Sequence, residues 1–180
     1  MSLLSYTAIQ HLLEQGVVEN AVPECVNGAS LDIRLGRYIR FESGVDNSQV
    51  SLKKREPLST SKWDLVEQGD YNLRAGEFIL ASSFEVFHLP LNLAAEYKLK
   101  SSMARVGLEH LNAGWCDPGW TGSVLTLELR NLTASHSIKL SYLDRIGQMI
   151  FWHTQPVPPE VSYSVQGRYN GDKQVQGVKK

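Results

Sequence analysis

Hydrophobic and polar residues follow two different periods along the chain, and the first of them is helical. Near the N-terminus the apolar residues recur at a spacing of three and four: Ile9, Leu12 and Leu13. Thr7, with Gln10 three residues later, has the pattern of a capping box, and Gly16 is a natural stop. The pattern therefore predicts one short helix between Thr7 and Gly16.

Beyond Gly16 the period changes to two, which is typical of half-buried strands. Apolar and polar residues alternate over 30–35, so we expect a strand with one polar face there. Further strand patterns occupy four segments: 77–81, 84–87, 123–129 and 146–152. Residues 91–99 fit either a helical turn or a strand, and both remain open. Residues 45–68 are polar and rich in Ser and Lys, and we interpret them as a loop excursion.

Many short strands with one N-terminal helix predict a mainly β fold, a barrel or jelly-roll. The length of 180 residues suits a single domain with a sizeable core, so we expect one domain over 1–180. The last stretch, 166–180, is polar and carries Gly167, Gly171 and Gly177. It is either a frayed tail or a flexible arm that closes over a ligand.

Composition and charge narrow the classes of function. The formal net charge of −1 does not indicate nucleic acid or an anionic membrane as a partner. No stretch approaches the ~18 apolar residues that a membrane span needs, and the N-terminus lacks the pattern of a signal peptide. Cys25 and Cys116 fit neither a disulfide framework nor zinc spacing. We therefore expect a soluble cytoplasmic protein.

Residues 100–107 bring cations and hydroxyl groups together. Lys100 and Arg105 carry positive charge, and Ser101 and Ser102 offer donors, a combination that suits phosphate oxygens. The spacing of a Walker loop is absent. A phosphate-binding turn and an ordinary solvated turn both fit this segment.

Residues 112–122 have the pattern of a tight hairpin. Asp117-Pro118-Gly119 places Pro and Gly at the central positions of a turn, which predicts type II. The flanking Trp115 and Trp120 either form the wall for a flat base or simply pack the hairpin.

Glu128 lies at the end of an apolar strand pattern. If the strand is regular, the leucines of 125–129 face the core, and Thr126 and Glu128 face the other way. A carboxylate among aliphatic neighbours is a candidate general base. The alternative is a solvated Glu paired with Arg130.

The order of these segments resembles that of the dCTP deaminase family, within the dCTP deaminase and dUTPase superfamily. Five segments carry the resemblance: 27–36 (the first family motif), 100–107 (Ser-Ser-Leu-Ala-Arg-x-Gly, with Met for Leu), 113–120 (the Asp-Pro-Gly hairpin), 145–151 (the Ile-Gly-Gln strand) and 168–171 (the Lys-Tyr-x-Gly arm). The resemblance extends from about residue 16 to residue 177.

The resemblance implies a dUTPase-type distorted β-barrel, assembled as a homotrimer with active sites between subunits. It implies conversion of dCTP to dUTP and ammonia, with Mg²⁺ carried by the triphosphate. Zinc is not expected, because the chain contains no Cys-x-x-Cys and no His-x-Glu of the zinc deaminases.

By matching position, Glu128 activates the attacking water and shuttles its proton, and Ser101 and Arg105 line that water and the phosphates. The other positions that the resemblance assigns to nucleotide binding are Lys100 and Ser102 (phosphates), Asp117 (the deoxyribose 3′-hydroxyl), Thr126, Gln148 and Tyr163, and Arg168 and Tyr169 (the closing arm).

Three departures from the family pattern bear on this assignment. The stretch between Arg105 and Asp117 is one residue short, and the stretch between Gly122 and Glu128 is one residue long. Glu128 keeps its face of the strand only if a bulge absorbs the change. In addition, Asp172-Lys173 stands where the family arm commonly has Gln.

Alternative activities remain open beside the dUTP-forming deaminase. Gly114-Trp115 looks more like the bifunctional members, which take dCTP on to dUMP and pyrophosphate, than like the His-Arg of strict deaminases. A plain dUTPase is less well matched, because its Gly-rich arm contains a Phe and this chain has none after Phe151. A non-catalytic nucleotide-binding regulator is the alternative from another class.

Overall fold

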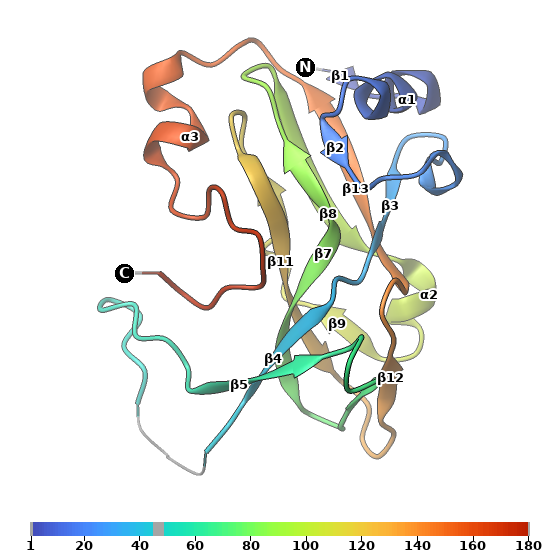
Figure 1. Cartoon of the computed structure of the whole chain (residues 1–180), viewed down its shortest axis with the longest axis vertical. Coiled ribbons are helices and arrows are strands. Elements are labelled where there is room, and N and C mark those ends of the chain that lie inside the picture. The colour runs from blue at the N-terminus through green and yellow to red at the C-terminus, as the bar shows by residue number, and fades with distance from the viewer. Residues whose placement is uncertain (1, 45–48, 180) are drawn as a thin grey trace.

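The computed structural model describes residues 2–44 and 49–179, and antiparallel sheets dominate it (Figure 1). The five-stranded sheet has the order β1–β13–β8–β10, with β3 also paired to β13. Its strands are β1 (Ser2–Leu3), β3 (Leu31–Arg34), β8 (Leu93–Leu99), β10 (Trp115–Cys116) and β13 (Arg145–His153).

The six-stranded sheet has the order β5–β4–β7–β11–β9, with β2 paired to β7. Its strands are β2 (Val18–Glu19), β4 (Tyr38–Glu42), β5 (Thr60–Asp64), β7 (Phe78–His88), β9 (Leu108–His110) and β11 (Thr121–Asn131). A two-stranded sheet joins β6 (Tyr71–Leu73) and β12 (Ile138–Leu140). The helices are α1 (Tyr6–Glu14), α2 (Ser101–Ala104) and α3 (Tyr163–Gln166), with short 3-10 turns at Pro23–Cys25 and Pro159–Val161.

One hydrophobic cluster joins the two large sheets. The five-stranded sheet contributes fully buried side chains from β3, β8 and β13, and the six-stranded sheet contributes them from β7 and β11: Leu31, Ile33, Leu93, Phe151, Ile79, Phe87 and Leu127. Each such side chain stabilises the fold by about 1.5–3 kcal/mol. The expectation of a mainly β fold with an N-terminal helix is confirmed.

The N-terminal helix exists, but the expected cap is wrong. Helix α1 begins at Tyr6, its N-cap is Ser5, and no side chain forms a capping hydrogen bond. Gln10 instead donates from Nε2 to the hydroxyl of Tyr6 at 2.9 Å, so it does not serve the helix end. The stop at Gly16 is confirmed, because this residue adopts φ +70°, which glycine reaches without strain.

Three strand expectations need correction. Asp32 is buried on the face of β3 expected to be polar, because Lys100 and Asn27 bind its carboxylate there. The segments 77–81 and 84–87 form one strand, β7, interrupted by a bulge. The expected loop 45–68 contains β5, whose five residues pair with β4; residues 45–48 of that loop lie outside the described residues. The ambiguous segment 91–99 contains strand β8.

Candidate active site

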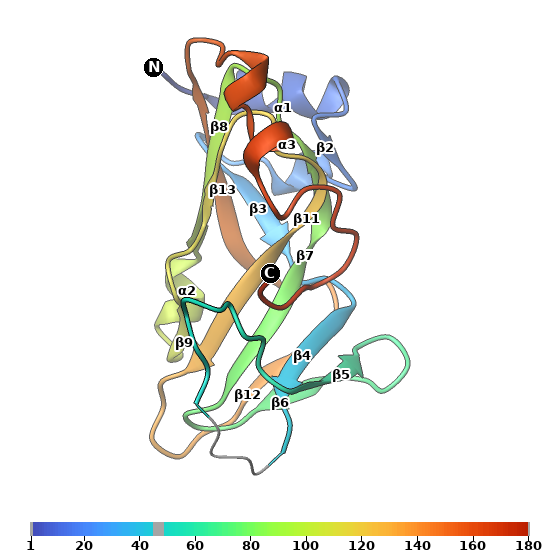
Figure 2. The same ribbon diagram turned by 90° about the vertical axis from the view of Figure 1, so that its left-hand side faces the viewer.

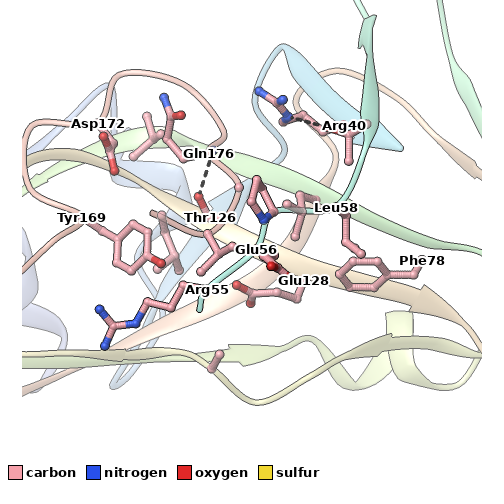
Figure 3. Close-up of a pocket in the computed structure, with 18 of the residues that line it drawn as sticks. Arg40, Arg55, Glu56, Leu58, Phe78, Thr126, Glu128, Tyr169, Asp172 and Gln176 are labelled. Atoms are coloured by element: carbon pink, nitrogen blue, oxygen red, sulfur yellow. Dashed lines mark hydrogen bonds between the residues drawn. The ribbon is translucent and has the colours of Figure 1, made fainter. Parts of the chain in front are cut away.

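A cavity of about 570 Å³ lies over the outer face of β11. Its volume falls in the range of small-molecule sites, about 300–1,000 Å³. Thr126 and Glu128 come from β11, and Phe78 and Leu80 from β7. Residues 50–58 and the C-terminal segment complete the wall, as Figure 3 shows. The cavity is therefore built from segments that are far apart in the sequence.

Two irregularities of the β7–β11 register put Glu128 on this wall. Thr121 pairs with His88 and Ser123 with Phe87, so β11 carries one extra residue at that point. A second irregularity follows before Thr126, after which the pairing is regular up to Arg130. The register of β11 against β7 is thus irregular close to the stretch where the spacing departs from the family pattern. As expected, the leucines of 125–129 are buried and Thr126 and Glu128 face the cavity.

The carboxylate of Glu128 lies near the imidazole of His110. Its side chain is 25% exposed, and its Oε2 lies 3.5 Å from Nε2 of His110, whose side chain is 2% exposed. Neither atom forms a hydrogen bond within the described parts of the chain. His110 escaped the sequence analysis because a lone His on a short strand carries no motif.

The C-terminal segment lies over β11 beside the cavity (Figure 2). Trp120 donates from Nε1 to the carbonyl of Tyr169 at 2.8 Å, and the amide of Thr121 donates to the side chain of Asn170 at 2.7 Å. The amide of Val124 donates to the carbonyl of Asp172 at 2.8 Å. The segment also buries Val175. It is therefore positioned by backbone contacts to β11, as an arm over a ligand requires.

The C-terminal segment places two polar residues, Asp172 and Gln176, at the cavity. Asp172 lines the cavity and forms an ion pair with Lys179. Gln176 also lines the cavity, and its backbone N–H donates to the hydroxyl of Thr126 at 3.5 Å (Figure 3). A Gln side chain is therefore available at the cavity, a few residues later than the family pattern places it.

Two arginines in the cavity wall were missed by the sequence analysis. Arg40 lies on β4 and donates from Nε to the hydroxyl of Thr60 at 3.0 Å. Arg55 comes from the segment 50–58, as does Glu56. Cations in the wall suit an anionic ligand. Nothing in their sequence surroundings distinguishes them from ordinary surface residues.

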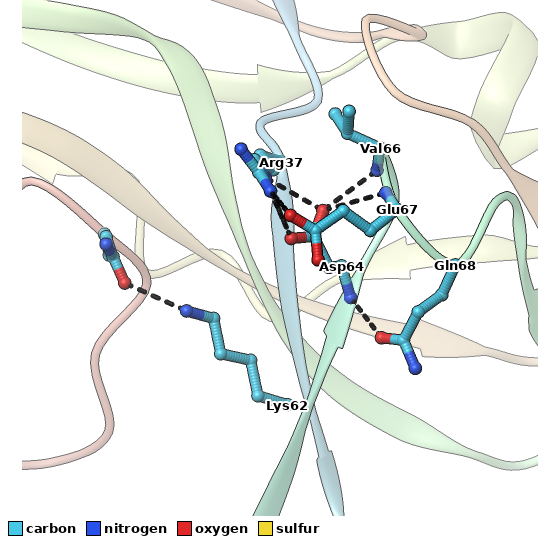
Figure 4. A network of polar contacts seen from close by, with 7 residues as sticks. Arg37, Lys62, Asp64, Val66, Glu67 and Gln68 are labelled. Atoms are coloured by element: carbon cyan, nitrogen blue, oxygen red, sulfur yellow. Dashed lines mark hydrogen bonds and ion pairs between the residues drawn. The ribbon is translucent and has the colours of Figure 1, made fainter.

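Ion pairs hold the end of the β4–β5 pairing that lies away from residues 50–58 (Figure 4). Arg37 donates to Asp64 from Nε at 2.9 Å and contacts Glu67 at 2.6 Å. The guanidinium of Arg37 lowers the pKa of Asp64 to about 2. On the same strand, Lys62 donates to Gln174 at 3.2 Å. Strand β5 is thus tied both to β4 and to the C-terminal segment.

The Asp117 hairpin has the expected turn. Gly119 adopts φ +86°, and the amide of Trp120 donates to the carbonyl of Asp117 at 3.2 Å, as in a type II turn. Trp120 is buried and stacks on Phe87 at 5.4 Å, so it mainly packs the hairpin. Trp115 is exposed, lines the cavity and donates from Nε1 to Asp117 at 2.8 Å.

A second, smaller hollow adjoins the cavity. Four of the predicted binding residues line it: Asp117, Tyr163, Arg168 and Tyr169. Tyr163 and Tyr169 also line the larger cavity, so the two hollows share a wall. The structure thus brings the arm and the hairpin to the neighbourhood of Glu128.

The residues of segment 100–107 are not brought to Glu128 within the chain. Lys100 forms an ion pair with Asp32 at 2.6 Å, and Ser101, Ser102 and Arg105 are exposed on or after α2. None of them lines the cavity. Figure 1 shows α2 on the opposite side of the molecule from the C-terminal segment. Gln148, on β13, likewise lies outside the cavity wall.

Packing against Tyr97 explains why a glycine occupies position 147 in the Ile-Gly-Gln strand. A Cβ at Gly147 would lie 2.0 Å from the ring of Tyr97 on the neighbouring strand β8. Gly114 is equally confined, since its Cβ would lie 2.6 Å from the carbonyl oxygen of Tyr97. Both glycines therefore allow close contact with Tyr97.

Residues 2–44 and 49–179 contain no cluster of three or more His, Cys, Asp and Glu side chains that is placed to hold a metal ion. Over the same ranges, no helix is long and apolar enough to span a membrane. Both cysteines are buried as free thiols, and burial raises their pKa values.

Comparisons with known proteins agree with this architecture. The model of the dCTP deaminase-like family matches residues 3–154. A "dCTP deaminase, dUMP-forming" of Acidothermus cellulolyticus is 38% identical over 155 residues, covering 84% of this chain and 80% of that protein. One of Kocuria rhizophila is 34% identical over 177 residues, covering 95% and 91%.

Among solved structures, the 2′-deoxycytidine 5′-triphosphate deaminase of Agrobacterium tumefaciens superposes with a TM-score of 0.66 at 24% identity. The match covers 83% of this chain and 47% of that longer chain, and it establishes the shared fold.

Fold and relatives together define an enzyme of the deaminase class, a hydrolase built on a mainly β scaffold. The chain belongs to the dCTP deaminase-like family. The resemblance drawn from the five motifs is thereby confirmed. The family match ends at residue 154, so Tyr163, Arg168 and Tyr169 lie beyond it.

Proposed function

We propose that this protein deaminates dCTP and continues to dUMP and pyrophosphate. The observation that carries the proposal is the position of Glu128 on the wall of a nucleotide-sized cavity. The dUMP-forming names of the relatives support the second step. This end product replaces the dUTP that the sequence analysis favoured.

The surroundings of residue 114 also favour the dUMP-forming branch. Because a Cβ at Gly114 would lie 2.6 Å from the carbonyl oxygen of Tyr97, the His of the strict deaminases does not fit here without a backbone shift. The Gly-Trp pair is therefore built into the hairpin beside the cavity.

In the first reaction, water adds to C4 of cytosine and the C4–N bond breaks. Glu128 accepts one proton from the water and returns it to the leaving amino group, which departs as ammonia. The second proton of the water ends on N3 of the uracil. In the second reaction, the oxygen of another water binds the α-phosphorus, and the bond to the bridging oxygen of the β-phosphate breaks. The sum is dCTP and two waters giving dUMP, pyrophosphate and ammonia.

The residues around the cavity receive roles that follow their positions. Thr126 lies near Glu128 on β11 and lines the same cavity, so we assign it to contact with the pyrimidine base. We assign Asp117, which lines the adjoining hollow, to the sugar; Tyr163 and Tyr169 line both hollows. Arg168 and the rest of the segment 166–180 act as the closing arm. We include Mg²⁺ as part of the substrate, carried by the triphosphate.

A second subunit is required to complete this site. Ser101, Ser102 and Arg105 are exposed, and none of them lines the cavity that contains Glu128. We therefore propose that a homotrimer brings them, with Lys100 and Gln148 behind them, to the cavity of a neighbouring subunit. Each chain contributes one domain, supported by its single hydrophobic cluster.

Mixing two inactive variants tests this arrangement. Glu128→Gln and Arg105→Ala chains are co-expressed with different tags, and the hetero-oligomers are purified through both. If Glu128 and Arg105 come from different subunits, each mixed trimer has one of its three sites intact, so about a third of the wild-type sites are restored. Hetero-oligomers that stay as inactive as the separate variants would place the whole site within one chain.

A product assay tests the reaction itself. The protein is incubated with dCTP or with dUTP, both with Mg²⁺, and nucleotides are separated by anion exchange while ammonia is measured. We expect dUMP, pyrophosphate and ammonia from dCTP. Accumulation of dUTP alone would identify a strict deaminase, and dUMP from dUTP without ammonia from dCTP would identify a plain dUTPase. Binding without turnover would identify a regulator.

A further inference from the structure

His110 and Glu128 lie on two paired strands, β9 and β11. His110 ends β9 and pairs with Leu129, the residue that follows Glu128 on β11. Its Nε2 and the Oε2 of Glu128 are 3.5 Å apart. Both atoms are buried and lack a hydrogen-bond partner in the part of the chain that the structure describes. Buried polar atoms are rarely left in this state.

The imidazole ring has little freedom to turn away. Its side chain is only 2% exposed. The ring of Tyr97 packs edge-on against it, with centroids 4.7 Å apart and an interplanar angle of 63°. Tyr97 is held in turn by Gly147 and Gly114, whose missing side chains leave room for it. Three strands therefore hold the ring with Nε2 3.5 Å from the carboxylate.

We propose that His110 is the positioning residue of the catalytic carboxylate. The neutral imidazole donates its Nε2–H to Oε2 of Glu128 and leaves Oε1 free for the attacking water. The separation of 3.5 Å exceeds the ordinary N–H···O range of about 2.7–3.2 Å, so the contact shortens when the substrate is bound. The inference rests on the proposed role of Glu128 and adds a residue to it.

This arrangement has a chemical consequence. A carboxylate that rotates freely presents either oxygen to water, and much of its time is spent in unproductive orientations. A single donor to Oε2 fixes the rotation of the carboxylate. Hydrogen bonds to metal-binding side chains orient those side chains in the same way. His110 neither gains nor loses a proton in the cycle, because the proton from water travels on Glu128.

The test uses substitutions that differ in the reach of a donor. His110→Gln places an amide Nε2 near the position of the imidazole Nε2, whereas His110→Asn is too short and His110→Leu has no donor. We expect kcat for ammonia release to fall about 10- to 100-fold in the Leu and Asn variants, with KM nearly unchanged. The Gln variant should recover most of the activity. Glu109→Gln, on the same strand but outside the cavity wall, is the matched control and should retain full kcat.

The outcomes separate this inference from the proposed function. Wild-type kcat in folded His110→Asn or His110→Leu protein, checked by thermal denaturation, would overturn it. An equal fall in the Gln and Asn variants would overturn it too, because packing rather than a donor would then matter. If His110→Leu does not fold, the comparison of kcat between His110→Asn and His110→Gln still tests the inference. Undiminished ammonia release in Glu128→Gln would instead remove the proposed function of Glu128 itself.

Discussion

Replacing Glu128 by Gln is expected to abolish ammonia release from dCTP while nucleotide binding is retained. The Gln side chain has nearly the same shape and keeps its place between Thr126 and the cavity wall. It has no basic oxygen to accept a proton from water, however. Loss of a general base typically lowers the rate about 100- to 10,000-fold. The effect should appear in kcat, with little change in the affinity for dCTP.

A coupled assay of ammonia release measures kcat. Calorimetric titration of the Glu128→Gln variant with dCTP and Mg²⁺ measures the affinity for dCTP. Arg130→Gln is a suitable control, because Arg130 lies on the same strand, is exposed and does not line the cavity. Ammonia release at the wild-type rate would show that another group acts as the base. Loss of dCTP binding together with activity would assign Glu128 to binding.

Removal of the carboxylate of Glu85 is expected to lower the free energy of unfolding strongly. Glu85 is fully buried, and its Oε1 lies 2.8 Å from Nε of Arg34, whose side chain is 13% exposed. The backbone amide of Arg34 donates to Oε2 at 3.0 Å. Burial raises the pKa of Glu85, and the hydrogen bonds from Arg34 act in the opposite direction. Glu85→Ala removes the carboxylate partner of a largely buried guanidinium and leaves the amide of Arg34 unpaired, which destabilises by about 3–5 kcal/mol.

Urea denaturation followed by circular dichroism, at one fixed protein concentration, measures this loss. Glu67→Gln is the matched control: Glu67 also pairs with an arginine, Arg37, but its side chain is 71% exposed. We expect that change to alter stability by about 1 kcal/mol or less. A similarly small loss in Glu85→Ala would show that Arg34 finds water or another partner when the carboxylate is removed.

Sequence patterns were informative where a property depends on neighbouring residues. The Asp117 turn follows from Pro118 and Gly119, because a type II turn needs a positive φ at its second central position. Alternation along 125–129 placed the leucines inside and Glu128 outside, because strand side chains alternate between faces. The expected capping box at Thr7 is wrong because the helix has its N-cap at Ser5, two residues earlier.

The surroundings of each polar residue depended on contacts between distant strands. Asp32 was expected on a solvated face, but Lys100, 68 residues later, buries and pairs with it. The excursion 45–68 contains a strand only because β5 forms backbone hydrogen bonds with the edge of β4. Such pairings carry no signal within a short window of sequence, since the partner strand decides them.

By itself, then, the sequence determined the family, the mainly β class and the face of β11 that carries Glu128, because short motifs and alternation are local properties of the chain. Tertiary structure alone decided the neighbours of that carboxylate. It brought His110 from β9 to within 3.5 Å of Glu128 and laid the C-terminal segment over the cavity. It also left Ser101 and Arg105 outside that cavity. These relations arise from sheet pairing and register, which join residues that no local pattern connects.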